Sequence, residues 1–268
     1  MIDTAYRGVD VSSYQGIIDW SAAAADGIRF AMIKATQGRS VSDPALSGFT
    51  DSRFIGNVTG ASGAGIACGA YHYLTALNEG EAIAEADVFL SAAAPYRDLL
   101  PLGLAVDVED SRLPRDRNAL TAIVRMFCRR VSRAGFTIMV YTNPDFLRNR
   151  FDVTRDTGLW LALWRDIGRP PASDDYPGLR MWQYGTDTVA GIRGPVDVNF
   201  GIRGLLGQQA AKIDYAEEVR RRAGLSETTM QYLAGYRWGE DLIRKLYLAM
   251  TEQNGQNGTE PKGEEQNR

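Results

Sequence analysis

The chain has 268 residues, of which 44% are hydrophobic, 24% charged and 10% aromatic, so its composition is that of an ordinary folded protein. Its formal net charge of -3 and isoelectric point near 5.4 argue against nucleic acid and other polyanionic partners. No apolar run of about 18 residues predicts a membrane span. The segment from Met1 to Arg7 has neither the basic nor the apolar region of a signal peptide, so we expect none.

Eight short apolar or alternating segments predict β-strands. They are residues 7–11, 29–36, 65–74, 101–109, 137–143, 158–164, 179–184 and 196–200. Helical patterns lie between several of them, at residues 19–26, 79–94 and 116–134. This alternation predicts an α/β protein with an irregular β/α (TIM-like) barrel, whose last third is closed by hairpin-like or short links.

The pattern becomes purely helical after Gly207, which predicts a domain boundary there. We therefore expect a catalytic barrel at 1–207, a small all-α module at 208–250 and a disordered tail at 251–268. Within the module, Leu242, Ile243, Leu246, Tyr247 and Met250 form an apolar stripe at helical spacing. Such a module suits cell-wall binding or self-association.

The cysteines and the histidine are expected to be structural. Cys68 and Cys128 lie far apart in apolar surroundings without metal-ligand spacing, which predicts two buried free thiols. His72 lies between two tyrosines and on the opposite strand face from both, so a hydrogen-bonded core histidine is the favoured interpretation. The chemistry is therefore left to carboxylates.

Four acids fall on three predicted strands. In the segment from Pro101 to Asp110, one face carries Leu102, Leu104, Val106 and Val108, and the other carries Gly103, Ala105, Asp107 and Glu109. Asp10 and Asp197 have similar places on the first and last strands. The carboxyl ends of barrel strands carry the active site, so we expect all four at one rim. Crowded carboxylates raise one another's pKa, which suits a general acid and glycosidic bond cleavage.

Two alternatives apply to these acids. An aspartate at a strand end often caps the next helix or pairs with an arginine, here Arg112 or Arg115. A metal site could use the same carboxylates, although no further acid or histidine lies nearby at ligand spacing.

Aromatic and amide side chains accompany the acids, and these bind sugars through ring faces and hydrogen bonds. Each aromatic could equally belong to the core. The aromatic residues at or near strand ends are Tyr14, Tyr71, Tyr73, Tyr141, Trp160, Trp164, Trp182 and Tyr184, and the polar ones are Asn143, Gln183 and Asn199. Of these, we predict substrate contacts for Tyr71, Tyr73, Tyr141, Asn143, Trp160, Trp182 and Gln183.

Eight ordered segments between about residues 6 and 200 resemble the family 25 glycoside hydrolases, which are lysozymes of the N-acetylmuramidase type. They are GVDVSSYQG with IDW, FAMIKATQG, GAYHY, LAVDVE, YTN, LWLA, MWQY and VDVN. The loop at 75–78 departs from the family pattern, which leaves its substrate contacts open. The related chitinases would need Asp where this chain has Leu102 and Ala105.

The resemblance implies an irregular β/α barrel that hydrolyses the β-1,4 bond from N-acetylmuramic acid to N-acetylglucosamine in bacterial peptidoglycan, without a cofactor. It implies that Glu109 is the general acid/base and that Asp107 orients the acetamido group or stabilises charge at the anomeric carbon. Asp10 and Asp197 would hold the network and tune its protonation. A covalent intermediate, acetamido participation and inversion all stay open.

The expected partner is peptidoglycan, with self-association through 208–250 as a further expectation. Without a signal peptide, the favoured setting is a phage-type endolysin that waits in the bacterial cytoplasm and then acts on the cell wall. The alternatives are a non-catalytic peptidoglycan-binding lectin on the same barrel and a different barrel hydrolase that cleaves chitin or uses a metal.

Overall fold

The computed structural model describes residues 2–39, 48–153, 157–165, 170–172, 174–202 and 215–236, and residues 239, 242, 243, 245–247, 249 and 250. The chain divides into two compact units, Met1–Ala93 with Arg97–Ala211, and Ala94–Tyr96 with Lys212–Arg268. The predicted boundary after Gly207 and the predicted tail at 251–268 lie outside the described residues.

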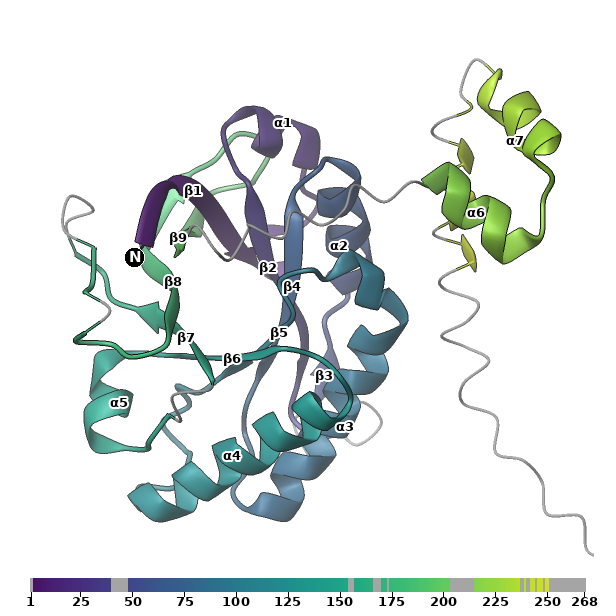
Figure 1. The fold of residues 1–268 in the computed structure, drawn as a ribbon. Coiled ribbons are helices and arrows are strands. Elements are labelled where there is room, and N and C mark those ends of the chain that lie inside the picture. The colour runs from purple at the N-terminus through teal and green to yellow at the C-terminus, as the bar shows by residue number, and fades with distance from the viewer. Residues whose placement is uncertain are drawn as a thin grey trace, which may run out of the picture. The chain divides into compact units, whose positions relative to one another are not determined.

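Within the described residues, nine strands form one sheet in the order β1-β9-β8-β7-β6-β5-β4-β2-β3, and β1 also pairs with β2 (Figure 1). That second pairing closes eight strands into the predicted irregular barrel, while β3 pairs with β2 alone. The strands are β1 (Ile2–Val11), β2 (Phe30–Gln37), β3 (Phe49–Thr50), β4 (Ala67–Tyr73), β5 (Leu104–Asp107), β6 (Ile138–Thr142), β7 (Gly158–Ala162), β8 (Leu179–Thr188) and β9 (Pro195–Ile202).

The strand directions explain how the barrel closes. The neighbours from β1 through β2 and β4 to β8 run parallel, whereas β9 is antiparallel to both β8 and β1. The predicted hairpin-like closure is therefore confirmed for β8 and β9, but β7 and β8 are parallel. Because β9 is reversed, its first residues lie at the same end of the barrel as the last residues of β1.

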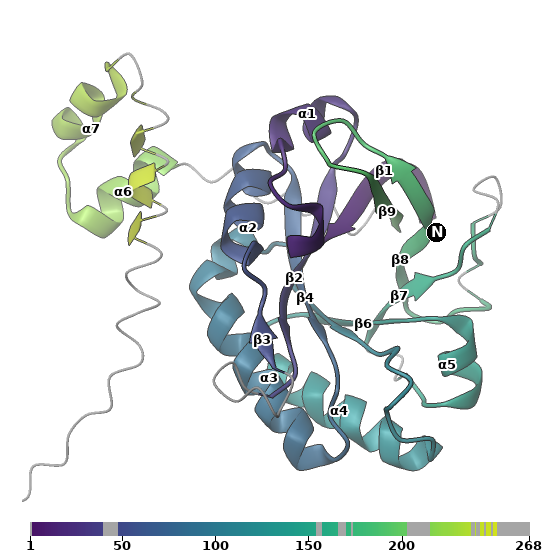
Figure 2. The same ribbon diagram turned by 180° about the vertical axis from the view of Figure 1, so that it is seen from behind.

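Helices cover the outside of the barrel (Figures 1 and 2). They are α1 (Trp20–Ala25), α2 (Phe54–Gly63), α3 (Glu79–Ala93), α4 (Arg117–Arg133) and α5 (Pro144–Asn149), with short 3-10 turns η1 (Ser13–Gln15) and η3 (Ala94–Leu99). Of these, α1, α3 and α4 match the predicted helices, whereas α2 and α5 were not predicted. Asp116 caps α4 by accepting a hydrogen bond from the amide of Ala119. The buried side of α4 includes Leu120, Val124, Phe127 and Val131.

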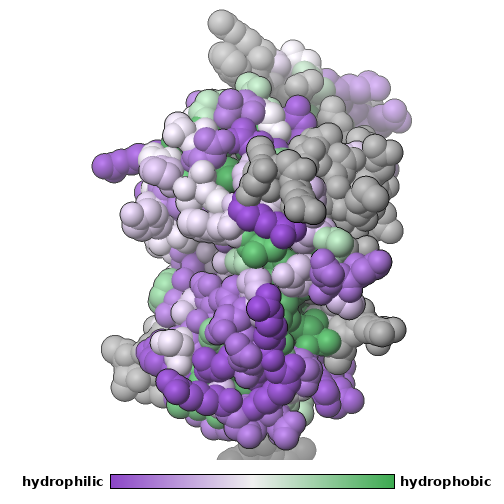
Figure 3. Space-filling view, turned by 90° about the vertical axis from the view of Figure 1, so that its left-hand side faces the viewer, coloured by the Kyte–Doolittle hydropathy of each residue, from purple (hydrophilic) through white to green (hydrophobic). Residues whose placement is uncertain are grey.

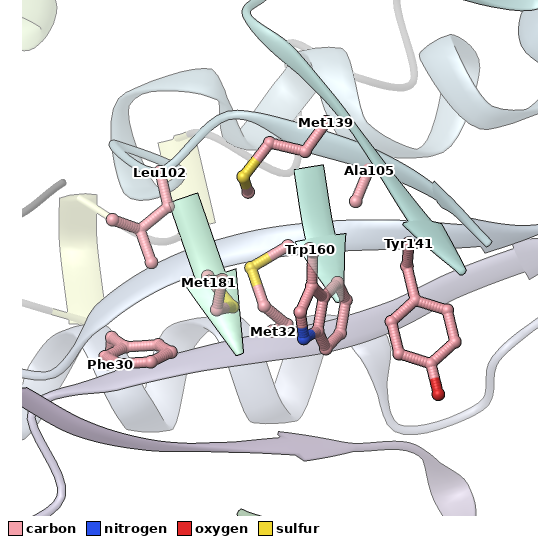
Figure 4. Close-up of a cluster of buried hydrophobic side chains, with 8 residues drawn as sticks. All are labelled: Phe30, Met32, Leu102, Ala105, Met139, Tyr141, Trp160 and Met181. Carbon is pink, nitrogen blue, oxygen red and sulfur yellow. The ribbon is translucent and has the colours of Figure 1, made fainter. Parts of the chain in front are cut away.

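A cluster of apolar side chains fills the barrel interior (Figure 4). Its buried members are Phe30, Met32, Leu102, Ala105, Met139, Tyr141, Trp160 and Met181. The expectation that Leu102 shares the outward face with Leu104 is wrong, because Leu102 belongs to the same cluster as Ala105. The cause is Gly103, whose φ of 75° breaks the alternation just before β5 begins.

Polar side chains dominate the part of the surface seen in Figure 3, with hydrophobic ones between them. Trp160, Trp182 and Phe30 are among the largest side chains that are fully buried in the barrel. No helix in the described part of the chain has the length and apolar character needed to cross a membrane.

The C-terminal unit contains α6 (Tyr215–Ala223), α7 (Glu227–Ala234) and further helical residues between 239 and 250. Its buried side chains include Val219, Met230, Ile243 and Tyr247, and the last two come from the predicted apolar stripe. The guanidinium of Arg222 lies 4.7 Å from the ring centre of Tyr247. This part of the chain is thus helical, as predicted, with an apolar centre of its own.

The conformation of Gly103 gives a stability prediction. A Cβ at this position would overlap the hydroxyl of Thr137 and lie 2.7 Å from its carbonyl oxygen, in a backbone conformation that disfavours side chains. Gly103→Ala should lower the free energy of unfolding by about 2 to 3 kcal/mol in urea denaturation. The control is Gly56→Ala, where a Cβ has open space in α2, and it should be neutral or stabilising. Equal effects of the two substitutions would contradict this account.

Candidate active site

The four predicted acids come from strands that meet at one end of the barrel. Asp10 is the penultimate residue of β1, Asp107 is the last residue of β5, and Glu109 follows two residues later. Asp197 lies near the start of the reversed strand β9, where its Cα pairs with that of Asp10. Each acid influences at least one of the others electrostatically. The structure therefore brings the four carboxylates together.

Two amides fix the carboxylate of Asp10. Its Oδ2 accepts hydrogen bonds from Asn199 Nδ2 at 2.7 Å and from Gln183 Nε2 at 3.0 Å. The amide oxygens are held in turn, by Trp160 Nε1 on Asn199 at 2.7 Å and by the Tyr141 hydroxyl on Gln183 at 3.1 Å. Asp10, Gln183, Asn199 and Trp160 are all buried, so this network has little freedom to rearrange.

Burial raises the pKa of both inner carboxyls. For Asp10 it is the largest cause, followed by the charge of Asp197, and together they raise the pKa to about 7 despite the two amide donors. For Asp107, burial and then the charge of Glu109 raise the pKa well above its usual range. Its Oδ1 is buried and has no hydrogen-bond partner among the described residues. One carboxyl oxygen of Asp107 is thus buried and unpaired in the described part of the chain.

Glu109 and Asp197 lie nearer the solvent. Glu109 is exposed, yet protein atoms around its carboxyl exclude part of the water, and with the charge of Asp197 they raise its pKa. Partial burial also raises the pKa of Asp197. The alternative pairing with Arg112 is not seen, since Arg112 binds Asp110 at 2.6 Å instead.

Aromatic rings line the space beside the acids. Tyr71 and Trp160 meet edge to face with ring centres 6.0 Å apart, and Tyr141 and Trp160 are 4.6 Å apart. Trp164 is 60% exposed and donates its Nε1 hydrogen to Gln183 Oε1 at 3.0 Å. These rings therefore connect to the residues that hold Asp10.

Two of the predicted contact residues have side chains that are hydrogen-bonded within the protein. Trp182 is fully buried, packs against Phe200 in a separate apolar cluster, and donates its Nε1 hydrogen to the carbonyl oxygen of Leu163. Asn143 caps α5, its Oδ1 accepting from the amides of Asp145 and Phe146. Both are occupied in supporting the fold.

The histidine and the two cysteines are buried structural residues, as predicted. His72 is fully buried, with Nε2 2.8 Å from Glu85 Oε2 and Nδ1 2.8 Å from the Thr36 hydroxyl. Burial lowers its pKa. Cys68 and Cys128 are buried free thiols, and burial raises the pKa of each to about 12.

The sequence-based prediction missed Lys34 and Asp51. Lys34 lies two residues beyond Met32 on β2, so the period of two could have placed it at the barrel mouth among the acids. Asp51 is buried and accepts hydrogen bonds from the amides of Ser13 and Arg53. It follows β3, a two-residue strand with no sequence signal.

The arrangement is suited to proton transfer between carboxyls and a bound molecule. It combines raised carboxyl pKa values, an unpaired buried oxygen and adjacent aromatic rings, as in sites that cleave sugars. In the described part of the chain, no group of three or more His, Cys, Asp or Glu residues is placed to hold a metal ion.

Comparison with known proteins agrees with this geometry. Residues 9–191 match the sequence profile of glycosyl hydrolases family 25. The chain belongs to this family. It is 31% identical over 205 residues to Lysozyme M1 of Streptomyces globisporus, covering 72% of this chain and 66% of that protein. It is 32% identical over 189 residues to an N,O-diacetylmuramidase of Arthroderma benhamiae, covering 66% and 75%.

Among solved structures, the bacterial lysozyme from Streptomyces coelicolor superposes with a TM-score of 0.64 and 28% identity. The match covers 78% of this chain and 98% of that one, and it supports the barrel fold. The chain spans just under two thirds of the length of Lysozyme M1.

The raised pKa of Asp10 gives a pH prediction. A carboxyl whose pKa is about 7 when folded and 3.8 when unfolded favours folding while it is protonated. That contribution is complete below about pH 4 and is lost as the pH rises through 7. Asp10→Asn, which can still accept from the two amides, should therefore be about 1 to 3 kcal/mol more stable than wild type at pH 7.5.

Thermal denaturation of both proteins at pH 4, 5.5 and 7.5 measures this difference, which should nearly vanish at pH 4. Asp145→Asn, an acid in the first turn of α5 at some remove from the four acids, is the control. A difference that is the same at all three pH values would show that the effect is not the titration of Asp10.

Proposed function

We propose that the protein is a peptidoglycan hydrolase that cleaves the β-1,4 bond from N-acetylmuramic acid to N-acetylglucosamine. The observation that carries the proposal is the place of Asp107 and Glu109 at the end of β5, within a cluster of four acids. In this cluster the charge of Glu109 raises the pKa of Asp107, and the charge of Asp197 raises the pKa of Glu109. Membership of glycosyl hydrolase family 25 supports the same reaction class.

Glu109 is the proposed general acid. Its raised pKa keeps the carboxyl protonated nearer to neutral pH, and its exposure allows it to reach the oxygen of a glycosidic bond. Donation of this proton lets the leaving sugar depart as a neutral alcohol. The resulting carboxylate can then take a proton from the water that completes hydrolysis.

Asp107 is the proposed partner on the substrate side. In its ionised form, the carboxylate at the end of β5 would orient the acetamido group of the sugar or stabilise positive charge at the anomeric carbon. Asp10 and Asp197 place further negative charge beside the pair and so raise the pKa values on which proton donation depends.

Substrate contact is proposed for the half-buried rings of Tyr71 and Tyr73. Tyr141, Trp160 and Gln183 are buried and form the floor that orients Asp10. For Asn143 and Trp182 we propose a structural role, since their side-chain groups are already hydrogen-bonded within the protein.

The proposed place of action is the bacterial cell wall, where the substrate lies. We further propose storage in the bacterial cytoplasm until release, in the manner of an endolysin. Fractionation of producing cells before and after lysis tests this, and retention of the protein in the wall fraction before lysis would contradict it.

Glu109→Gln tests the proposed reaction. The amide cannot donate a proton as an acid does, so release of soluble fragments from purified peptidoglycan should fall about 10²- to 10⁴-fold. Borohydride reduction and mass spectrometry of the wild-type digest should show new reducing ends at muramic acid. Glu79→Gln, an exposed acid at the start of α3, should keep full activity.

Glucosamine ends would assign a different bond. Intact glycan that still binds the wild-type protein would instead favour a non-catalytic lectin.

For the C-terminal unit we propose cell-wall binding. Tyr232 is 72% exposed and Tyr236 63% exposed, and their ring centres are 6.4 Å apart. Two neighbouring exposed rings are suited to stacking on sugars. Exposed apolar groups that lie side by side often mark a binding surface.

The test uses the full-length double variant Tyr232→Ser/Tyr236→Ser, made in the Glu109→Gln background. It should bind sedimented cell walls at least about fivefold more weakly than Glu109→Gln alone, because two ring contacts of about 0.5 to 1.5 kcal/mol each are lost. Light scattering of both proteins distinguishes the other proposed role. A dimer that dissociates in the double variant, with unchanged wall binding, would assign the unit to self-association.

A further inference from the structure

Lys34 is a cation held in place inside the acidic cluster. Its Nζ donates a hydrogen bond to Gln37 Oε1 at 2.9 Å and lies 5.2 Å from the ring centres of both Phe49 and Tyr73. Two ring faces and one amide oxygen attract an ammonium from three neighbouring elements, β2, β3 and β4. A flexible lysine side chain is thereby fixed at the mouth of the barrel.

Burial lowers the pKa of Lys34, and the charges that face it in the described part of the chain oppose this because they are negative. They are Asp107 and Glu109 at the end of β5 and Asp51 after β3. On β4, His72 is bonded to Glu85 and Thr36, and burial favours its neutral form. Lys34 has no carboxylate within 4.0 Å in the described part of the chain, so it acts on the acids through space.

We propose that Lys34 is a positioning residue for the catalytic proton, because its fixed ammonium favours the ionised form of Asp107 and so leaves the proton on Glu109. This inference rests on the proposed hydrolase function and adds a residue to its site.

Burial alone would place the proton wrongly. Asp107 is buried, whereas Glu109 is exposed, so loss of water favours the neutral form of Asp107 more than that of Glu109. A proton kept on Asp107 would leave Glu109 ionised and unable to act as an acid. The positive charge of Lys34 opposes this, because it lowers the pKa of both carboxyls and interacts more strongly with Asp107 than with Glu109.

Removing the charge should therefore change the pH profile and not only the rate. In Lys34→Met and Lys34→Gln, both carboxyls hold their protons to higher pH. Both limbs of the kcat/KM profile should then move upward by about one pH unit, for a charge several ångströms away at an effective dielectric constant of about 20 to 40. The maximum should fall about tenfold, because more of the single proton resides on Asp107.

Lys34→Arg is the matched variant, because it keeps the charge and should keep both limbs within about 0.3 pH units of wild type. Arg39→Gln removes a positive charge that pairs with Glu81 on α3 and should leave the profile unchanged. All variants are tested as full-length proteins on purified peptidoglycan from pH 4 to 9, after thermal denaturation has shown that they fold.

A shift in the Met and Gln variants but not in the Arg variant supports the inference. Equal loss of activity in all three without a shift would assign Lys34 to packing and overturn it. Wild-type protein that releases no reducing ends would count against the hydrolase function itself. In that case, NMR titration of labelled Asp and Glu carboxyls in wild type and Lys34→Met still decides whether Lys34 sets their protonation.

Discussion

The double pairing of β1 is the constraint on which the rest of the structure depends. This strand lies between β2, to which it is parallel, and β9, to which it is antiparallel, and so closes the barrel. Closure at this seam requires close packing, because a Cβ on Gly8 would overlap the ring of Phe30. The same pairing sets Asp10 opposite Asp197. A barrel opened at this seam would keep its helices but would separate the first acid from the last.

Burying several acids in one place opposes stability, and the surroundings show how the fold tolerates it. Asp10 is offset by two amide donors, and the carboxyls at the end of β5 are offset by the charge of Lys34. Asp107 retains an unpaired oxygen, so the compensation is incomplete. Polar groups whose hydrogen bonds were all made within the protein would gain little from binding a sugar or releasing a proton. The uncompensated burial of these acids is therefore part of the chemistry of the site.

Much of this could be predicted from sequence, because strand alternation is a local signal. The period of two placed Asp107 beside Ala105 on the inner face, and the motif order indicated the family. The prediction failed where a single backbone angle or a distant contact decides the outcome. Leu102 turned inward because Gly103 breaks the pleat. The burial of Trp182 involves Phe200 of β9, which is distant in sequence. Asp51 was missed because it follows β3, a two-residue strand whose pairing with β2 has no signal in the sequence.

The hydrogen bonds on Asp10 join residues that are 173 and 189 positions apart, so the site depends on contacts between the first and the last strands of the barrel. A growing chain on the ribosome therefore has no complete acid cluster until β9 has been made, however well its earlier βα units have formed. Synthesis then continues through the residues of the C-terminal unit. The order of the strands thus means that the four acids come together only late in the synthesis of each chain.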